Sequence, residues 1–124
     1  MIILVCGGRD YADWATLDEV LSQVHKTASI ELLVHGAARG ADSMAGQWAR
    51  DNGIQEVLCP ANWRTHGKSA GYKRNKAMLG LRPELVIAFP GGRGTEVMIN
   101  LSERAGITVI KITGSVRDEQ EKDS

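Results

Sequence analysis

The chain alternates short apolar runs with amphipathic stretches, and this alternation limits its fold more than any other feature. Runs that are apolar on both faces and rich in β-branched residues are typical of buried parallel strands. The stretches between them mostly carry apolar residues at helical spacing, as crossover helices do. The sequence therefore predicts an α/β domain with a mostly parallel sheet of about five strands. The expected strands are Ile2–Cys6, Glu31–His35, Gln55–Cys59, Glu84–Phe89 and Thr108–Ile112.

The pattern between the strands predicts four helices and one irregular segment. With 124 residues, the chain has room for one hydrophobic core, so we expect a single domain over residues 1–113. Residues 114–124 are polar and highly charged, and we expect a disordered tail there. We expect helices from about residue 11 or 13 to 27, and over about 41–52, 70–81 and 95–105, with an irregular segment over 61–69.

The charge pattern excludes some classes of protein. The formal net charge is zero, whereas proteins that coat nucleic acids carry a basic excess, so we expect no nucleic-acid partner. Residues 61–83 nevertheless hold six Lys or Arg and no acid, which predicts one locally basic face. No apolar run reaches membrane-spanning length, and the two cysteines, Cys6 and Cys59, have no disulfide or metal-type spacing. We therefore expect a cytoplasmic protein with both thiols reduced and buried.

Three of the expected strands end in glycine-rich loops, and each loop contains one arginine. The carboxyl ends of parallel strands meet at one edge of a sheet, where ligands bind in α/β proteins. Glycine lets backbone approach a ligand closely, arginine offers a planar fork to phosphate, and a helix N-terminus attracts anions. Any one such loop is equally an ordinary turn with a solvated arginine, but three at one edge favour an anion site. The candidate residues are Gly7, Gly8, Arg9, Gly36, Arg39, Gly40, Pro90, Gly91, Gly92, Arg93, Gly94 and Thr95, with Thr95 as the expected helix N-cap.

A second group combines aromatic rings with cations. Rings stack on bases and cations hold phosphates, so this composition is typical of a nucleotide site. The alternative is that Trp63 anchors the packing and the cations form a solvated helix face; the local basic excess slightly favours the site. The candidates here are Trp63, His66, Lys68, Arg74 and Asn75.

Motifs of several well-known enzyme classes are absent or incomplete. No Gly-x-Gly-x-x-Gly follows the first strand, and no Gly-x-Ser-x-Gly elbow is present. Gly67-Lys68-Ser69 resembles the end of a P-loop, but Asn62 stands where that motif requires glycine. The three histidines have no Glu or Cys at ligand spacing, so we expect no cofactor and no metal site built by the protein, while a metal that accompanies the ligand is not excluded. We interpret His35 as a buried imidazole rather than a base.

Several of these stretches together resemble the SLOG superfamily, which joins the Smf/DprA proteins with the LOG cytokinin-activating proteins. Within it, the similarity is to the YspA-like, YpsA-related branch. The resemblance implies a Rossmann-like three-layer fold that holds nucleotides or nucleotide-derived signals at its glycine loops, and a homodimer or higher homo-oligomer. The stretches that carry it are Cys6–Tyr11, His35–Asp42, Trp63–Gly67, Arg74-Asn75 and Ala88–Thr95.

The chain departs from the LOG enzymes at the position of their catalytic glutamate. Those enzymes continue Pro-Gly-Gly-x-Gly-Thr-x-x-Glu, whereas this chain has Met98 at the ninth position and Glu96 two places earlier. Two residues span about 200° of helical rotation, so Glu96 cannot take the same role. We therefore expect a module that binds a nucleotide or an ADP-ribose-like ligand, as a sensor or sequestering protein.

Two alternatives stay open. The first is a hydrolase of N-glycosidic or phosphoribosyl bonds, which needs a carboxylate near the ribose. The available acids are Asp42, Asp10 and Glu96, of which Asp42 more readily orients the second glycine loop. The second alternative is single-stranded DNA binding, as in the DprA relatives.

Overall fold

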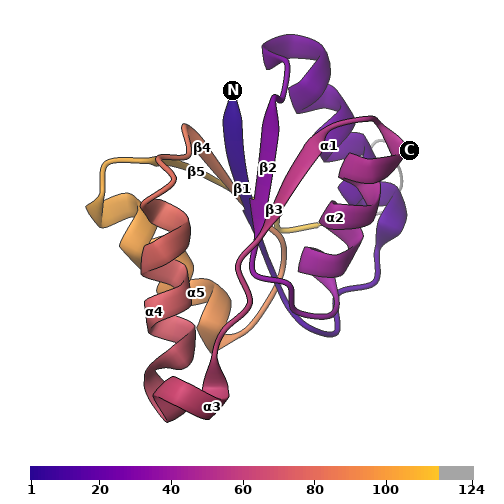
Figure 1. The fold of residues 1–124 in the computed structure, drawn as a ribbon. Coiled ribbons are helices and arrows are strands. Elements are labelled where there is room, and N and C mark those ends of the chain that lie inside the picture. The colour runs from indigo at the N-terminus through magenta and orange to yellow at the C-terminus, as the bar shows by residue number, and fades with distance from the viewer. Residues whose placement is uncertain (115–124) are drawn as a thin grey trace.

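The computed structural model describes residues 1–114, and it has the α/β architecture that the sequence predicts (Figure 1). The expected tail lies outside the described residues except for Gly114. The strands are β1 (Ile2–Cys6), β2 (Leu32–His35), β3 (Gln55–Leu58), β4 (Leu85–Ala88) and β5 (Thr108–Lys111). The helices are α1 (Trp14–Ala28), α2 (Ala41–Asp51), α3 (Trp63–His66), α4 (Ala70–Leu79) and α5 (Arg93–Arg104), with a 3-10 turn, Gly67–Ser69, after α3.

All five strands pair in parallel, in the order β3-β2-β1-β4-β5. The central strand, β1, alternates its side chains between two hydrophobic clusters because successive residues of a strand point to opposite faces. Ile3 and Val5 belong to the cluster under α1 and α2, and Leu4 and Cys6 belong to the cluster under α4 and α5. The mostly buried strand β1 therefore joins the two halves of the core.

The helices cover the two faces of the sheet in pairs, as Figure 1 shows, with α1 and α2 on one face and α4 and α5 on the other. The chain leaves β1 toward α1 but leaves the neighbouring strand β4 toward α5, on the opposite face. Where adjacent strands send their connections to opposite faces, a crevice opens beyond their carboxyl ends. The topology therefore predicts the ligand position before any side chain is considered.

Two local expectations are corrected by the structure. Segment 61–69 is not irregular: it forms α3 and the 3-10 turn, because Oδ1 of Asn62 accepts a hydrogen bond from the Thr65 amide at 3.1 Å and caps the short helix. Helix α5 does not begin at Thr95. It begins at Arg93, with Gly92 as its N-cap and no side-chain cap. Within residues 1–114, no helix is both long enough and apolar enough to cross a membrane.

Candidate functional site

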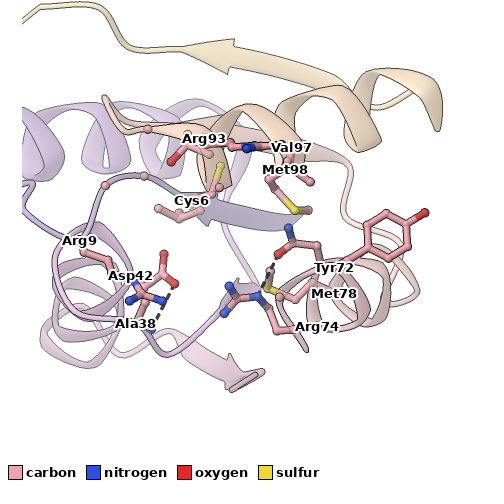
Figure 2. A pocket seen from close by; sticks show the side chains of 18 of the residues that line it. Cys6, Arg9, Ala38, Asp42, Tyr72, Arg74, Met78, Arg93, Val97 and Met98 are labelled. Carbon is pink, nitrogen blue, oxygen red and sulfur yellow. Dashed lines mark hydrogen bonds between the residues drawn. The ribbon is translucent and has the colours of Figure 1, made fainter. Parts of the chain in front are cut away.

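A cavity of about 570 Å³ lies beyond the carboxyl ends of β1 and β4, at the crevice that the topology creates. Its volume is within the range of small-molecule sites. In Figure 2, the α5 residues Arg93 and Met98 lie above this pocket and Asp42 and Arg74 lie below it. The predicted site residues that line it are Gly7, Gly8, Arg9, Trp63, Lys68, Arg74, Asn75, Gly92, Arg93, Gly94 and Thr95.

The N-terminus of α5 opens into this cavity with its amides unbonded. The first N–H groups of a helix have no partner within the helix, and Gly92 provides no side-chain cap. Within the described residues, the amides of Arg93, Gly94 and Thr95 make no hydrogen bond. The positive end of the α5 dipole is therefore available to an anion.

The N-terminus of α2, by contrast, is already occupied by backbone. The carbonyl of Gly8 accepts a hydrogen bond from the Ala41 amide at 3.1 Å, and the carbonyl of Ala38 accepts one from the Ser43 amide at 3.1 Å. The two helix starts were similar in sequence, since each follows a glycine loop. Of these two helix starts, as far as the described residues show, only α5 leaves all three of its first amides without a partner.

The glycines of the β4–α5 loop have two different roles. A Cβ added at Gly92 or Gly94 would meet no atom within 4 Å, so at both positions open space lies above the backbone. A Cβ at Gly91 would lie 2.6 Å from the Gly8 amide nitrogen and 3.0 Å from the Gly7 carbonyl carbon. Gly91 therefore lets two loops pack together, whereas Gly92 and Gly94 leave room for a ligand.

Four cations line the cavity, and three of them are unpaired. Within residues 1–114, Arg9, Lys68 and Arg93 form no salt bridge. Arg74 has a structural role, because its Nη1 donates to the Gly36 carbonyl at 2.7 Å and its Nε donates to Oδ1 of Asn75 at 2.9 Å. The three unpaired side chains give the cavity an excess of positive charge.

The sequence interpretation missed the apolar wall of the cavity. Met98 is only 2% exposed and packs in the cluster that also contains Cys6 and Met78. The position that holds the LOG glutamate is thus occupied by a thioether, and Glu96 is exposed and does not line the cavity. In the sequence, two features point to this apolar lining. Met98 replaces the LOG glutamate, and Met78 follows Arg74 by one helical turn, so that both lie on the same face of α4. The apolar lining consists of Val5, Cys6, Met78, Val97 and Met98.

Cys6 does not supply a nucleophile to this cavity. Burial, followed by the negative charge of Asp42, raises the pKa of its thiol to about 12, while the charge of Arg74 opposes this. Only the thiolate is strongly nucleophilic, so the thiol is inert at neutral pH. Cys6 and Cys59 are both free cysteines, as expected, but Cys59 is only partly buried.

We expect the native protein to resist alkylation at Cys6. Peptide mapping by mass spectrometry after iodoacetamide treatment at pH 7.5 should show no adduct on Cys6, and the same treatment in urea should label both cysteines. Rapid native labelling of Cys6 would contradict the raised pKa and would make this thiol a candidate nucleophile.

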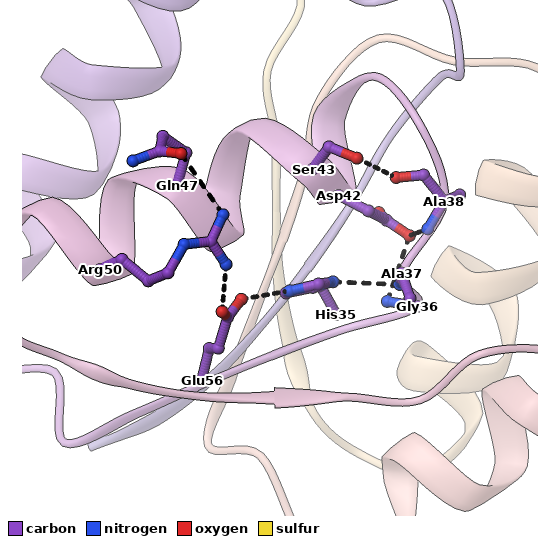
Figure 3. A network of polar contacts seen from close by, with 9 residues as sticks. All are labelled: His35, Gly36, Ala37, Ala38, Asp42, Ser43, Gln47, Arg50 and Glu56. Carbon is purple, nitrogen blue, oxygen red and sulfur yellow. Dashed lines mark hydrogen bonds and ion pairs between the residues drawn. The ribbon is translucent and has the colours of Figure 1, made fainter.

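Asp42 orients the loop after β2, as the sequence interpretation favoured. Its Oδ2 accepts hydrogen bonds from the Gly36 amide at 3.1 Å and the Ala38 amide at 3.3 Å (Figure 3). The side chain also lines the cavity. Burial raises the pKa of its carboxyl, while the two loop amides, the nearby His35 ring and the charge of Arg74 oppose the shift.

His35 is a buried positioning residue, which confirms its interpretation as a structural imidazole. Its Nδ1 accepts a hydrogen bond from the Ala37 amide at 3.0 Å, so the ring proton is on Nε2, which lies 2.7 Å from Oε2 of Glu56. Arg50 contacts the other oxygen of Glu56 (Figure 3). Ala37 has a positive φ of 59°, and the bond to His35 helps to hold it there.

A smaller cavity of about 320 Å³ lies beside the first and shares Arg9, Trp63 and Arg74 with it. Two further predicted residues, Gly36 and Arg39, line this second cavity. Nη2 of Arg39 is 3.2 Å from Oδ1 of Asp10, and both side chains are largely exposed. The site therefore continues from the α5 N-terminus toward the loop after β2.

The remaining predicted residues lie outside both cavity linings. Gly91 and Gly40 let their loops pack closely against the loop after β1, since a Cβ at either position would meet the backbone of that loop. The Pro90 carbonyl accepts a hydrogen bond from the Gly8 amide at 3.0 Å. Nδ1 of His66 lies 3.2 Å from Nζ of Lys73 on the exposed α3–α4 segment. In the part of the chain that the structure describes, no three His, Cys, Asp or Glu side chains gather as a metal site would require.

Comparison with known proteins gives both sequence and structural relatives. The family described as the YspA, cpYpsA-related SLOG family matches residues 1–66. The Gene 61 protein of Mycobacterium phage D29 is 37% identical over 116 residues, which cover 87% of this chain and 93% of that protein.

Two solved structures share the fold at low sequence identity. DNA processing protein A (DprA) from Streptococcus pneumoniae superposes with a TM-score of 0.75 at 20% identity over 92% of this chain, which spans only 50% of the DprA chain. The Moco carrier protein from Chlamydomonas reinhardtii superposes with a TM-score of 0.68 at 19% identity, covering 96% of this chain and 80% of that one.

Proposed function

This chain belongs to the YspA, cpYpsA-related SLOG family, and on that premise we propose that it binds a nucleotide or an ADP-ribose-like derivative as a sensor or sequestering module. The ligand occupies the larger cavity without being cleaved. The observation that carries the proposal is the uncapped N-terminus of α5, whose amides open into a cavity lined by unpaired cations.

Different parts of the cavity lining bind different groups of the ligand. A phosphate lies against the free amides of Arg93, Gly94 and Thr95, where the helix dipole and the Arg93 guanidinium neutralise it. The rings of Trp63 and Tyr72 are 51% and 50% exposed and line the same cavity. Aromatic rings exposed in this way stack on a base whatever its identity.

The hydrolase alternative depends on Asp42, whose carboxyl lines the cavity and has a raised pKa. A glycosidic hydrolase needs a carboxylate placed to stabilise an oxocarbenium-like transition state or to activate water. Against this, Oδ2 of Asp42 already accepts two loop amides, and the position of the LOG glutamate is occupied by Met98. These contacts favour binding over cleavage.

Single-stranded DNA binding is supported only by the basic segment, since the likeness to DprA concerns the fold. The cavity favours a small molecule over a strand, because its anion site lies at a loop end rather than along a groove. Self-association and a cytoplasmic location stay predictions. We include a homo-oligomer in the proposal, and static light scattering on the purified protein tests it.

The proposal is tested by mass spectrometry. Purified protein is incubated with a panel of nucleotides, ADP-ribose derivatives and cyclic dinucleotides, and bound and free small molecules are analysed separately. We expect one compound to be recovered intact from the denatured protein. Free base with ribose phosphate would instead identify a hydrolase, and binding of oligonucleotides alone would identify a DNA-binding protein.

Replacing Arg93 by alanine should weaken binding of that compound by about tenfold to a hundredfold, since a charge-assisted hydrogen bond contributes about 1.5–3 kcal/mol. The melting temperature should stay close to that of the wild type, because an exposed arginine contributes little to stability. Arg104→Ala, at the opposite end of α5, is the matched control and should bind normally. An unchanged affinity of Arg93→Ala would contradict the placement of the phosphate.

A further inference from the structure

Asp42 presents one carboxylate oxygen to the protein and the other to the cavity. The side chain is only 7% exposed, and its Oδ2 accepts the amides of Gly36 and Ala38. Within the described residues, Oδ1 has no hydrogen-bond partner, yet it is not among the fully enclosed unpartnered atoms. Figure 2 shows one oxygen joined to Ala38 and the other directed toward the open space of the pocket.

Asn75 provides the complementary group. It is 6% exposed and lines the same cavity, and its Oδ1 is occupied by Nε of Arg74. Its Nδ2 has no partner within residues 1–114 and is likewise not fully enclosed. The wall of the cavity therefore offers one unused acceptor, on Asp42, and one unused donor, on Asn75.

Both residues are more than nine-tenths buried, yet these two polar atoms reach the cavity, where a ligand that matches them can replace the water that would otherwise satisfy them. An ionised carboxylate only accepts hydrogen bonds, so Asp42 selects donors and repels phosphate. The phosphate is then restricted to the α5 N-terminus, where no carboxylate lines the cavity. The part of the ligand that faces Asp42 must carry hydroxyl or amino hydrogens.

We propose that Asp42 accepts hydrogen bonds from the ribose hydroxyls of the ligand, so that the site takes ribonucleotides in preference to 2′-deoxyribonucleotides. This inference rests on the proposed function and adds the class of sugar. A carboxylate near the second strand of a Rossmann-type sheet is chemically suited to the ribose 2′-hydroxyl. Asn75 then donates its amide hydrogen to a sugar oxygen beside it.

The test measures binding to four matched pairs of probes by calorimetry. The probes are AMP, GMP, CMP and UMP, each with the 2′-deoxynucleotide that differs from it by one hydroxyl. We expect the ribonucleotide of the best-binding pair to bind about tenfold to a hundredfold more tightly, the effect of one hydrogen bond to a charged group. Equal affinities within that pair would overturn the inference and leave nucleotide binding intact. If none of the eight probes bound, binding of nucleoside monophosphates would be rejected, and the sugar preference with it.

Asp42→Asn assigns the preference to this residue. An asparagine oxygen can still accept the amides of Gly36 and Ala38, so the loop is retained while the atom that faces the cavity changes from acceptor to donor. We expect the preference for the ribose form to disappear, with a melting temperature equal to or above that of the wild type. The control, Glu96→Gln, removes one negative charge from an exposed position outside the cavity and should keep the preference. A preference that persists in Asp42→Asn would overturn the assignment.

Discussion

Replacing Gly94 by alanine is expected to lower ligand affinity about a hundredfold while leaving the fold as stable as before or more so. A Cβ at this position meets no protein atom within 4 Å, and Gly94 lines the cavity. In a helix the Cα–Cβ bond leans toward the N-terminus, so the new methyl group projects over the free amides of α5. It would displace a phosphate from hydrogen bonds that contribute about 1.5–3 kcal/mol each.

The stability of this variant distinguishes a lost ligand site from a damaged fold. Alanine is a better helix former than glycine by up to about 1 kcal/mol, so the melting temperature should stay constant or increase. Calorimetry with the compound identified by mass spectrometry measures the affinity, and thermal unfolding measures the stability. If Gly94→Ala bound as the wild type does, the phosphate could not lie on α5.

Gly91→Ala is the matched control, since the same methyl group is added three residues earlier. There it would overlap Thr95 and approach the Gly8 amide nitrogen to 2.6 Å, so the loops after β1 and β4 must separate. Overpacking of this kind costs about 1–3 kcal/mol. We therefore expect this variant to lose both stability and binding, whereas Gly94→Ala loses binding alone.

The fold could be predicted from the sequence because it depends on periodicity and on the positions of glycine. The run Ile2–Cys6, apolar on both faces, is typical of a central strand, and the structure places it in the middle of the sheet. Boundaries were less certain. The start of α5 was placed at Thr95 from residue preference, but the helix begins at Arg93 with a glycine cap. The first amides of a helix can bind a ligand only if no side chain caps them. The position at which residue preference misplaced the start of α5 is therefore the position of the candidate anion site.

The site could be predicted only in part, because composition identifies loops but not which of their atoms are free. The loops that contain Gly36 and Gly92 have similar compositions, with glycines and one arginine each. In the structure, the amides of Gly36 and Ala38 are satisfied by Asp42, whereas those that follow Gly92 are open. The contacts of Asp42 are local, four and six residues apart, and depend on the turn that brings this side chain back onto the loop, whereas the enclosure of Met98 in the cavity wall depends on segments distant in sequence. Periodicity carries no information about such contacts.

The loop that Asp42 completes also depends on a second, more remote group, the pair formed by His35 and Glu56. Their side chains are 3% and 13% exposed, and Gly46 makes room for them, since a Cβ there would lie 2.8 Å from Nε2 of His35. Although burial acts against it, the hydrogen bonds from His35 and Arg50 lower the pKa of Glu56. The pair therefore contributes its stabilisation with Glu56 ionised.

Glu56→Ala is accordingly expected to destabilise the protein by about 1–3 kcal/mol at pH 7, because it leaves the buried Nε2–H of His35 without an acceptor. Glu56→Gln keeps an oxygen for that N–H and should lose about 1 kcal/mol or less, the usual contribution of an ion pair in which one partner, here Arg50, is exposed. Urea unfolding measures both variants.

A carboxyl with a lowered pKa stabilises the fold above its unfolded-state pKa and loses that effect as the pH falls through its folded-state pKa. The difference between wild type and Glu56→Ala should therefore shrink in acid, and a difference that stayed constant down to pH 3 would show that the ionised pair does not hold the loop.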